Sequence, residues 1–370
     1  MNSNSLDTFP RTLYFSSSRG IGFTYHLSEL ACRIGGDKNF LFVSGEREQF
    51  PGIFIKLDNS QVNRTTIPSL DTSKKLWEHL QKLITIIKTF KPEVIHTQTN
   101  YQLLLISLLK PFYKFKIIQT IHAFDNGTGG IKMRLTKSYI TSMCALFTDR
   151  VFFQSSFVKN NFKLLSRKSY NLAMGFETPE STQTKSFSLP LKIVYAAKFH
   201  KAKNHIWLIE ALEPLLLENL VTLTLPGNGD SFESVKLLTS QKDLSDKVIL
   251  PGWANRETIS KIYDEAHLAI VPSSSETLGH NIIEPLAYGI PVISFPVGIA
   301  PDIAEKSNSV TLVNFYAAEE IINIIKKYIH NSEDYNKTSL EAYDYFQKNL
   351  TWEIHIKKYK SFLIHLINPN

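Results

Sequence analysis

The sequence SSSETLGHNIIEPLAYGIPVI, residues Ser273 to Ile293, places two glutamates between a strand and a helix. The apolar run ending at Val271 predicts a buried strand, and the stretch around Glu284 predicts a helix. Glu276 then lies on the connecting loop, with Glu284 eight positions later, one or two turns inside the helix. Ligands of open α/β sheets bind outside the carboxyl ends of the strands, so both carboxylates can reach one ligand. Carboxylates accept hydrogen bonds from hydroxyls, which suits a sugar nucleotide.

The rest of the chain alternates apolar runs with amphipathic helical stretches, the pattern of parallel βαβ units. Ten of these runs are expected to be buried strands. Five lie in the first half, at 12–15, 39–43, 94–96, 116–120 and 150–153, and five in the second, at 192–195, 222–225, 247–250, 268–271 and 292–295. Between the two sets lies a Ser-, Thr- and Pro-rich stretch, 177–190, with the composition of a linker. A length of 370 residues suits two domains, and each set of strands is expected to close its own sheet.

The composition, 43% apolar and 20% charged, is that of a globular protein. Cys32 and Cys144 lie in apolar contexts without metal-ligand spacing, which predicts reduced core residues. The start lacks a basic region followed by an apolar run, and the apolar stretch Leu103 to Leu109 is too short to span a membrane. We therefore expect a cytoplasmic protein.

Positive charge is concentrated in the first half of the chain. Residues 1–185 carry 24 Lys and Arg against 13 Asp and Glu, whereas residues 186–370 carry 17 against 21. This asymmetry predicts an anionic partner for the first half. The chain has no zinc-finger, RNP-type or basic-zipper pattern, so we expect no nucleic acid and favour an anionic membrane surface. The lysine-rich stretch 72–91, with Trp77, is one candidate docking helix; taken alone, the pattern favours an apolar side that faces a core, and the charge of the whole first half favours the membrane.

The stretch from Pro272 to Ile293, with Gly298 and Pro301-Asp302 beyond it, resembles the Glu-x7-Glu signature of the retaining glycosyltransferases of family 4, the glycosyl transferases group 1. The alternative for the two glutamates is a pair of solvated charges on a helix face. The resemblance implies the α/β fold called GT-B, in which two Rossmann-like domains face each other across a cleft. Residues 1–180 would form the acceptor-side domain and residues 190–345 the nucleotide-sugar-binding domain. Residues 346–370 would form a C-terminal helix that packs back on the first domain.

The resemblance also implies roles in the second domain. Lys198 and Lys203 match the two cations that grip the donor diphosphate, although lysine replaces the usual arginine at position 198 and cannot form its bidentate fork. Cations there would stabilise the charge that grows on the departing nucleotide. Glu284 would bind the ribose hydroxyls, and Glu276 the donor sugar, with backbone amides near Gly279. The nucleotide base would dock near Trp253, which follows the strand at 247–250.

Three positions of the first domain match the family as well. Gly22 lies in a strand-to-helix turn whose backbone amides can approach an anion, with Arg19 beside it on the acceptor side. The turn could also be a purely structural one. His122 follows a buried strand and matches a histidine of the cleft wall, near the transferred sugar or its phosphate. His96 matches a second histidine that is structural.

The implied activity is that of a retaining hexosyltransferase that needs no metal and no cofactor; the chain contains no Asp-x-Asp. It would transfer a sugar from a nucleotide diphosphate sugar, with UDP preferred over GDP, to a glycan or lipid-linked glycan. The setting would be bacterial surface-polysaccharide or lipopolysaccharide assembly, with the protein peripheral on the inner face of the plasma membrane. Two alternatives stay open: a GT-B-fold nucleotide-sugar epimerase, which needs no acceptor, and a non-catalytic sugar-nucleotide-binding subunit.

Overall fold

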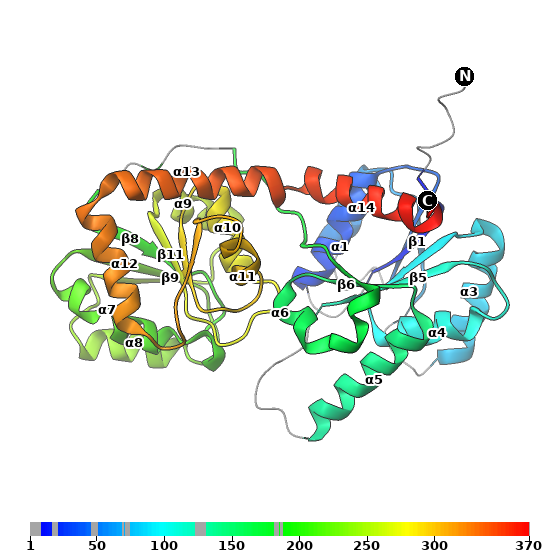
Figure 1. Cartoon of the computed structure of the whole chain (residues 1–370), viewed down its shortest axis with the longest axis horizontal. Coiled ribbons are helices and arrows are strands. Elements are labelled where there is room, and N and C mark those ends of the chain that lie inside the picture. The colour runs from blue at the N-terminus through cyan, green and yellow to red at the C-terminus, as the bar shows by residue number, and fades with distance from the viewer. Residues whose placement is uncertain are drawn as a thin grey trace.

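The computed structural model describes residues 9–16, 21–45, 51–68, 70, 75–122, 131–180, 185 and 188–369, with the backbone alone at 21–26, 51–54 and 131–133. Two α/β domains lie side by side, and each is a twisted parallel sheet with helices packed around it (Figure 1). The chain has the predicted GT-B fold.

The first sheet has seven parallel strands in the order β3-β2-β1-β4-β5-β6-β7. The strands are β1 Thr12–Phe15, β2 Phe40–Ser44, β3 Arg64–Thr66, β4 Val94–Thr97, β5 Lys116–Ile121, β6 Arg150–Phe153 and β7 Ser169–Asn171. Every residue of β1, β2 and β4 is buried, which explains their continuous apolar runs. All five strands expected in this half are confirmed. The short edge strands β3 and β7, whose side chains are partly exposed, were not predicted from the sequence.

The helices of this domain are α1 Ile21–Ile34, α2 Pro51–Asn59, α3 Leu76–Phe90, α4 Asn100–Leu109, α5 Ile131–Phe147, α6 Ser156–Lys159 and the 3₁₀ helix η3 Asn160–Lys168. The start of α4 is fixed by a capping box, in which Thr99 and Gln102 bond each other's backbone amides. On α3, the buried residues are His79, Leu83 and Ile87, so its apolar stripe faces the core of the domain.

The second sheet has six parallel strands in the order β10-β9-β8-β11-β12-β13. The strands are β8 Leu191–Val194, β9 Val221–Pro226, β10 Val248–Gly252, β11 Leu268–Val271, β12 Val292–Ser294 and β13 Val310–Leu312. The helices are η4 Lys201–Lys203, α7 His205–Leu217, α8 Phe232–Gln241, α9 Arg256–Glu265, α10 His280–Ala287, α11 Ala300–Ala304, α12 Ala318–His330 and α13 Ser332–Asn349. The five expected strands are again confirmed, and the edge strand β13 is an addition.

The last helix, α14 Trp352–Ile367, leaves the second domain and lies across the first (Figure 1). The crossing is fixed by two backbone bonds, from Phe176 N to Leu350 O at 2.9 Å and from Trp352 N to Phe176 O at 3.2 Å. Trp352, Tyr359 and Leu363 are buried in a core cluster shared with β1, β2 and α1. The predicted return of the C-terminal helix is confirmed. Within the described ranges, no helix combines the length and apolarity needed to cross a bilayer.

In both sheets the strand order reverses between the first and fourth strands of the domain, β1 and β4 or β8 and β11. At such a reversal the connections leave in opposite directions, and a crevice opens beyond the carboxyl ends of the two strands. The loops after β8 and β11 are therefore where the second domain can hold a ligand.

Candidate active site

The loops after β8 and β11 are bonded to each other, because these strands are neighbours in the sheet. Ser274 N donates to Ala202 O at 2.9 Å, and the Asn204 side chain donates to Pro272 O at 2.7 Å. Asn204 adopts a left-handed conformation, φ 55°, which turns the chain from η4 into α7. These bonds bring Lys203 and Glu276 together, although 73 positions separate them in the sequence.

Glu276 is held by three donors that all reach the same carboxylate oxygen. Its Oε1 accepts from Lys203 Nζ at 2.5 Å, from Ser273 Oγ at 2.8 Å and from Asn281 Nδ2 at 3.0 Å. Ser273 is in turn 2.7 Å from the buried Tyr195 hydroxyl. Since Ser273 donates its proton to Glu276, Tyr195 is the donor of that second bond. Burial keeps the pKa of Tyr195 well above its ordinary value, so the phenol retains this proton.

The second oxygen of Glu276, Oε2, accepts no hydrogen bond from any described residue. The side chain is 12% exposed, so the carboxylate is largely shielded but not sealed. One oxygen is thus fixed and the other can accept from a hydroxyl. Asn281 contributes a further acceptor, because its buried Oδ1 has no partner in the described parts of the chain.

Glu284 lies on α10, as predicted, and points to a different environment. Its Oε2 accepts from Tyr263 OH at 3.2 Å, and its Oε1 is 3.9 Å from His280 Nδ1. Desolvation raises the pKa of Glu284 to about 7, against the opposing effects of the Tyr263 bond and of Arg256. Water still reaches the side chain, which is 38% exposed. Near neutral pH this carboxyl is therefore poised between its two protonation states, and a partner that donates hydrogen bonds would favour ionisation.

Two glycines shape the loop that carries Glu276. Gly279 caps α10 with φ 92°, in the left-handed region that side chains avoid. Gly298, with φ 55°, lies against the back of the same loop, where an added Cβ would be 2.3 Å from Leu278 O and 3.0 Å from the Glu276 Cβ. The loop position therefore depends on the absence of a side chain at 298.

Two of the predicted donor-binding residues are exposed. Lys198 is exposed on the loop after β8. Trp253 is 76% exposed and follows β10, the edge strand three positions along the sheet from β11. The structure therefore bonds Lys203 to Glu276, with Glu284 on the adjoining helix, whereas the side chains of Lys198 and Trp253 are exposed to solvent.

In the first domain, three neighbouring strands each present a polar side chain at their carboxyl ends. His122 follows β5, and its ring nitrogens are both engaged: Nε2 lies 2.6 Å from Gln98 Oε1, and Gln154 Nε2 lies 2.9 Å from Nδ1. Gln98 follows β4 and Gln154 follows β6. With Gln98 accepting and Gln154 donating, His122 is neutral and carries its proton on Nε2. Neither glutamine was predicted from the sequence, where their one signal is their place after a buried strand.

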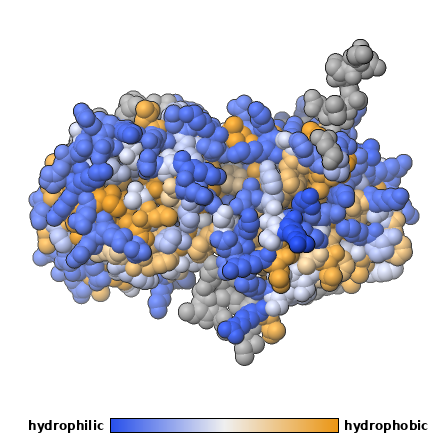
Figure 2. All heavy atoms as spheres, in the orientation of Figure 1, coloured by the Kyte–Doolittle hydropathy of each residue, from blue (hydrophilic) through white to orange (hydrophobic). Residues whose placement is uncertain are grey.

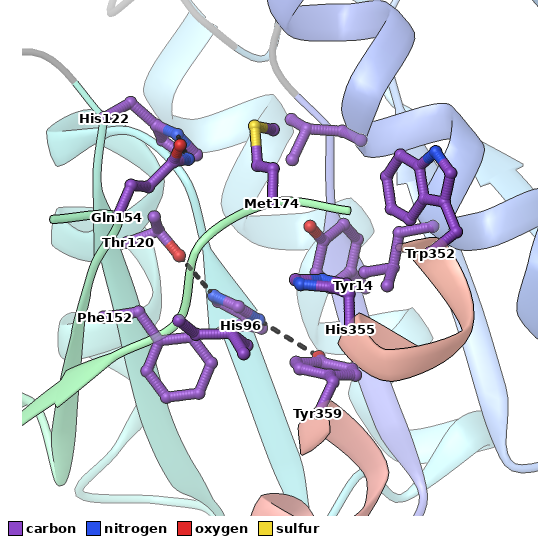
Figure 3. Close-up of a pocket in the computed structure, with 13 residues that line it drawn as sticks. Tyr14, His96, Thr120, His122, Phe152, Gln154, Met174, Trp352, His355 and Tyr359 are labelled. Carbon is purple, nitrogen blue, oxygen red and sulfur yellow. Dashed lines mark hydrogen bonds between the residues drawn. The ribbon is translucent and has the colours of Figure 1, made fainter. Parts of the chain in front are cut away.

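His96 and His122 both line a small cavity of about 30 Å³ between the sheet, α1 and α14 (Figure 3). Nε2 of His96 is 2.7 Å from Thr120 Oγ1 and its Nδ1 is 3.0 Å from Tyr359 OH. Burial lowers the pKa of His96 to about 3, so the ring is neutral. His96 therefore has the structural place that the sequence analysis expected, and it ties α14 to the sheet.

The loop after β6 in the first domain contacts the loop after β11 in the second. Ser155 Oγ, just after β6, donates to Thr277 O at 2.6 Å, next to Glu276 in the sequence. Ser156 N, at the start of α6, donates to Asp302 Oδ2 at 2.8 Å. The loop that holds Gln154 is thereby joined to the loop that holds Glu276.

The structure describes only part of the strand-to-helix turn that was predicted to hold Arg19 and Gly22. Gly22 lies in the first turn of α1, whereas Arg19 lies outside the described residues. Within the described ranges, no three His, Cys, Asp or Glu side chains gather as metal ligands would. Both cysteines are free, Cys144 buried and Cys32 half-buried.

Two family models match the chain. Residues 178–345 match "Glycosyl transferases group 1", and residues 37–167 match "Glycosyltransferase Family 4". A protein of the cps region of Klebsiella pneumoniae, described as uncharacterized, is 24% identical over 307 residues, 75% of this chain and 82% of that protein. The alpha-monoglucosyldiacylglycerol synthase of Streptococcus pneumoniae is 26% identical over 238 residues, 58% of this chain and 54% of that enzyme.

Among solved structures, the Anabaena protein HepE in complex with UDP has the same fold, with a TM-score of 0.79. The match covers 95% of this chain and 99% of that one at 15% identity. The family 4 match lies in the first Rossmann-like domain, and the group 1 match covers the second. The chain therefore belongs to the glycosyltransferases of group 1, with a family 4 first domain and the GT-B fold.

Proposed function

We propose that this glycosyltransferase is a retaining, metal-independent enzyme that transfers a hexose from a UDP-sugar to a glycan or lipid-linked glycan of bacterial surface polysaccharide. The observation that carries the proposal is the arrangement around Glu276. One oxygen is fixed by Lys203, Ser273 and Asn281, and the other is open to a sugar hydroxyl. A carboxylate held this firmly orients a bound sugar without reorganising during the reaction.

Lys203 supports the proposal that the enzyme needs no metal. Its ammonium lies beside the proposed sugar site, where the bond between the anomeric carbon and the diphosphate would break. A cation there stabilises the charge that develops on the departing nucleotide. Lys198, exposed on the same loop, would contact the outer phosphate as a point charge. No metal is needed for this neutralisation in the proposed mechanism.

Glu284 and the rim residues would hold the nucleotide. The carboxylate of Glu284 would accept from both ribose hydroxyls, and the base would dock near Trp253. UDP is proposed because HepE, a structure of the same fold, was obtained in complex with UDP. Gly22 at the start of α1 and His122 at the end of β5 would border the donor from the first domain, with Arg19 on the acceptor side.

The acceptor is proposed to be lipid-linked and the protein peripheral on an anionic membrane. Two relatives support this: one is a protein of a cps region, and the other is named as an alpha-monoglucosyldiacylglycerol synthase. Attack by the acceptor hydroxyl on the face that the phosphate leaves would retain the anomeric configuration.

A thermal-shift screen against UDP, GDP, the UDP- and GDP-hexoses and the other nucleoside diphosphates tests which nucleotide the donor carries. Specific binding raises Tm by mass action, and UDP-hexoses should give the largest shift. A larger shift with GDP-sugars would reject UDP. Incubation with donor alone then separates a transferase from an epimerase, because only the epimerase would form a new sugar without an acceptor.

Product chemistry tests the mechanism. A nuclear magnetic resonance spectrum of fresh product should show the donor's anomeric configuration, and inversion would reject the retaining assignment. Activity should persist in excess EDTA. Loss of activity on chelation, with recovery on adding a divalent cation, would reject the metal-independent assignment.

A further inference from the structure

The positive charge of the first domain is concentrated in one segment. Residues 100–171 hold eleven Lys and Arg but only two Asp, which accounts for nine of the eleven net positive charges of residues 1–185. This segment contains α4, β5, α5, β6, α6, η3 and β7. β5 and β6 are buried except for their first residues, Lys116 and Arg150, so most of this charge lies on the helices and their connections.

On α5, apolar side chains lie on the outward face as well as the inward one. Ile140 and Cys144 face the core, as expected of a helix that packs on a sheet. Leu135, Tyr139 and Leu146, spaced four and seven positions apart, form a stripe on the opposite face and are 65%, 47% and 73% exposed. A helix that faces water normally carries polar residues there, so this stripe calls for a partner.

The neighbours of α5 extend the same surface. Leu164 of η3 is 86% exposed, and η3 packs against α5 through Lys137, whose ammonium lies over the Phe162 ring. Phe112, in the turn after α4, is 78% exposed. The neighbouring Lys110 joins this turn to the end of α5 by its bond to Phe147 O at 3.1 Å.

Exposed cations accompany these apolar side chains. They are Arg134 at the start of α5, and Lys163 and Arg167 on either side of Leu164. Figure 2 shows hydrophilic and hydrophobic residues side by side over the lower edge of the first domain, where α5 projects in Figure 1.

We infer that this α5 face, defined by Leu135, Tyr139, Leu146, Leu164 and Phe112 with the cations beside them, docks on an anionic lipid surface. Apolar groups enter the headgroup layer while lysines and arginines contact the anionic headgroups, the combination that holds interfacial helices to membranes. The inference rests on the proposed lipid-linked acceptor and gives that proposal a defined surface.

Charge argues for lipid over a second copy of the chain. Two α5 faces brought together by a two-fold axis would place like charges opposite each other, which disfavours association. The α3 surface is a weaker candidate. Its apolar stripe is buried, and Lys75 and Lys82 both pair with Glu78, which leaves Trp77 as its main exposed apolar group.

The test is co-sedimentation of the full chain with vesicles of phosphatidylglycerol and phosphatidylcholine, and with vesicles of phosphatidylcholine alone, at low and high salt. One variant carries Leu135→Ser, Leu146→Ser and Leu164→Ser. A second carries Arg134→Glu, Lys163→Glu and Arg167→Glu. All six side chains are exposed, so folding should be unaffected. The matched control carries Lys236→Glu and Leu237→Ser on α8 of the second domain, both exposed, and Trp77→Ser tests α3.

We expect the parent protein to bind the anionic vesicles at low salt and to be released by high salt. Each triple variant should bind at least about tenfold more weakly, whereas the α8 control and Trp77→Ser should match the parent. Equal binding by parent and triple variants, or no preference of the parent for anionic lipid, would overturn the inference. A parent that is dimeric by analytical ultracentrifugation, and monomeric in the leucine variant without loss of vesicle binding, would assign the face to self-association instead.

Donor binding separates this inference from the proposed function. The nucleotide thermal shift should be the same in the parent and both triple variants, because the α5 face lies outside the donor domain. Loss of vesicle binding with an intact shift supports the docking face. An intact shift in a parent that ignores vesicles would remove the docking face and leave the glycosyltransferase proposal standing.

Discussion

Lys203 and Glu276 form a hydrogen-bonded ion pair of 2.5 Å, and their side chains are 21% and 12% exposed. The pair joins the loop after β8 to the loop after β11. Each partner therefore offsets the cost of shielding the other from water, and neither can be removed without leaving a partly buried charge. The same pair lies at the centre of the proposed donor site, so its chemistry and its stability are linked.

Replacing Lys203 with alanine should lower turnover by about 10²-fold or more, the scale for one preorganised group that stabilises developing charge. The matched control is Lys201→Ala, an exposed lysine of the same 3₁₀ helix, which should leave the rate unchanged. Lys198→Arg should be tolerated or faster, because arginine can bind phosphate with a bidentate fork. Steady-state assays measure all three, and a Lys203→Ala enzyme of normal rate would place the diphosphate elsewhere.

Glu284→Gln should weaken UDP-sugar binding more than it slows turnover at saturation, because ribose hydroxyls are bound equally before and during the reaction. The pKa of Glu284 near 7 adds a pH signature. Hydroxyl donors favour the carboxylate, so binding near pH 6.5 should release a proton in the parent protein and none in the glutamine variant. Calorimetry in two buffers of different ionisation enthalpy measures this release. Equal affinity and equal proton release in both proteins would reject the ribose role.

The same raised pKa predicts a stability change in the free protein. Glu284 ionises at a lower pH in the unfolded chain than in the folded one, so its contribution favours folding at acid pH and is lost as pH rises through about 7. Glu284→Gln should therefore raise Tm at pH 8 more than at pH 5. Thermal denaturation at the two values is the measurement, and the opposite order would contradict the raised pKa.

Gly298→Ala should destabilise the second domain and lower activity, because the new Cβ would lie 2.3 Å from Leu278 O behind the Glu276 loop. Gly252→Ala is the matched control. Gly252 also has a positive φ, 74°, but no atom lies within 4 Å of its added Cβ, so only the backbone strain of about 1 kcal/mol applies. Urea unfolding compares the two variants. Equal losses would show that the close contact at 298 is relieved by a shift of the loop.

Acid should destabilise the fold through buried histidines. His205 is buried against Phe199, and burial lowers its pKa to about 4. The unfolded chain takes up a proton near pH 6.5 and the folded chain does so only near 4, so stability present above 6.5 is lost as pH falls between these values. The loss is on the order of 3 kcal/mol for His205. Thermal denaturation at pH 7.5 and pH 5 gives the fall in Tm between the two values, and this fall should be smaller in His205→Phe than in the parent protein. An equal fall in both proteins would assign the acid sensitivity to other groups.

Nine of the ten predicted strands lie inside a sheet, where a strand buried on both faces is a continuous apolar run; the tenth, β10, is an edge strand with alternating burial. The sequence missed β3, β7 and β13, which are three-residue edge strands with partly exposed side chains. Such segments carry little periodic signal, and only their pairing with a neighbouring strand defines them. For α3, the sequence showed a lysine-rich amphipathic stretch but could not say whether its apolar side faced the core or a membrane.

For the site, the sequence placed Lys203 and Glu276 each after a strand, and the resemblance put them in one site. The bond between them depends on β8 and β11 being neighbours, which is a property of strand order and not of either segment. Gln98 and Gln154 had no local signal that set them apart from other polar residues after strands. They matter because β4, β5 and β6 are adjacent, which places both amides beside His122.

The place of α14 sets an order of events during synthesis on the ribosome. Tyr14, in the first strand, packs edge-on against the ring of Tyr359, near the end of the chain. The first domain is translated early, but its core lacks Trp352, Tyr359 and Leu363 until the whole second domain has emerged. Until then, the apolar surface that these side chains cover stays exposed in the nascent first domain. A premature stop just before Trp352 would therefore destabilise the half of the protein that is made first.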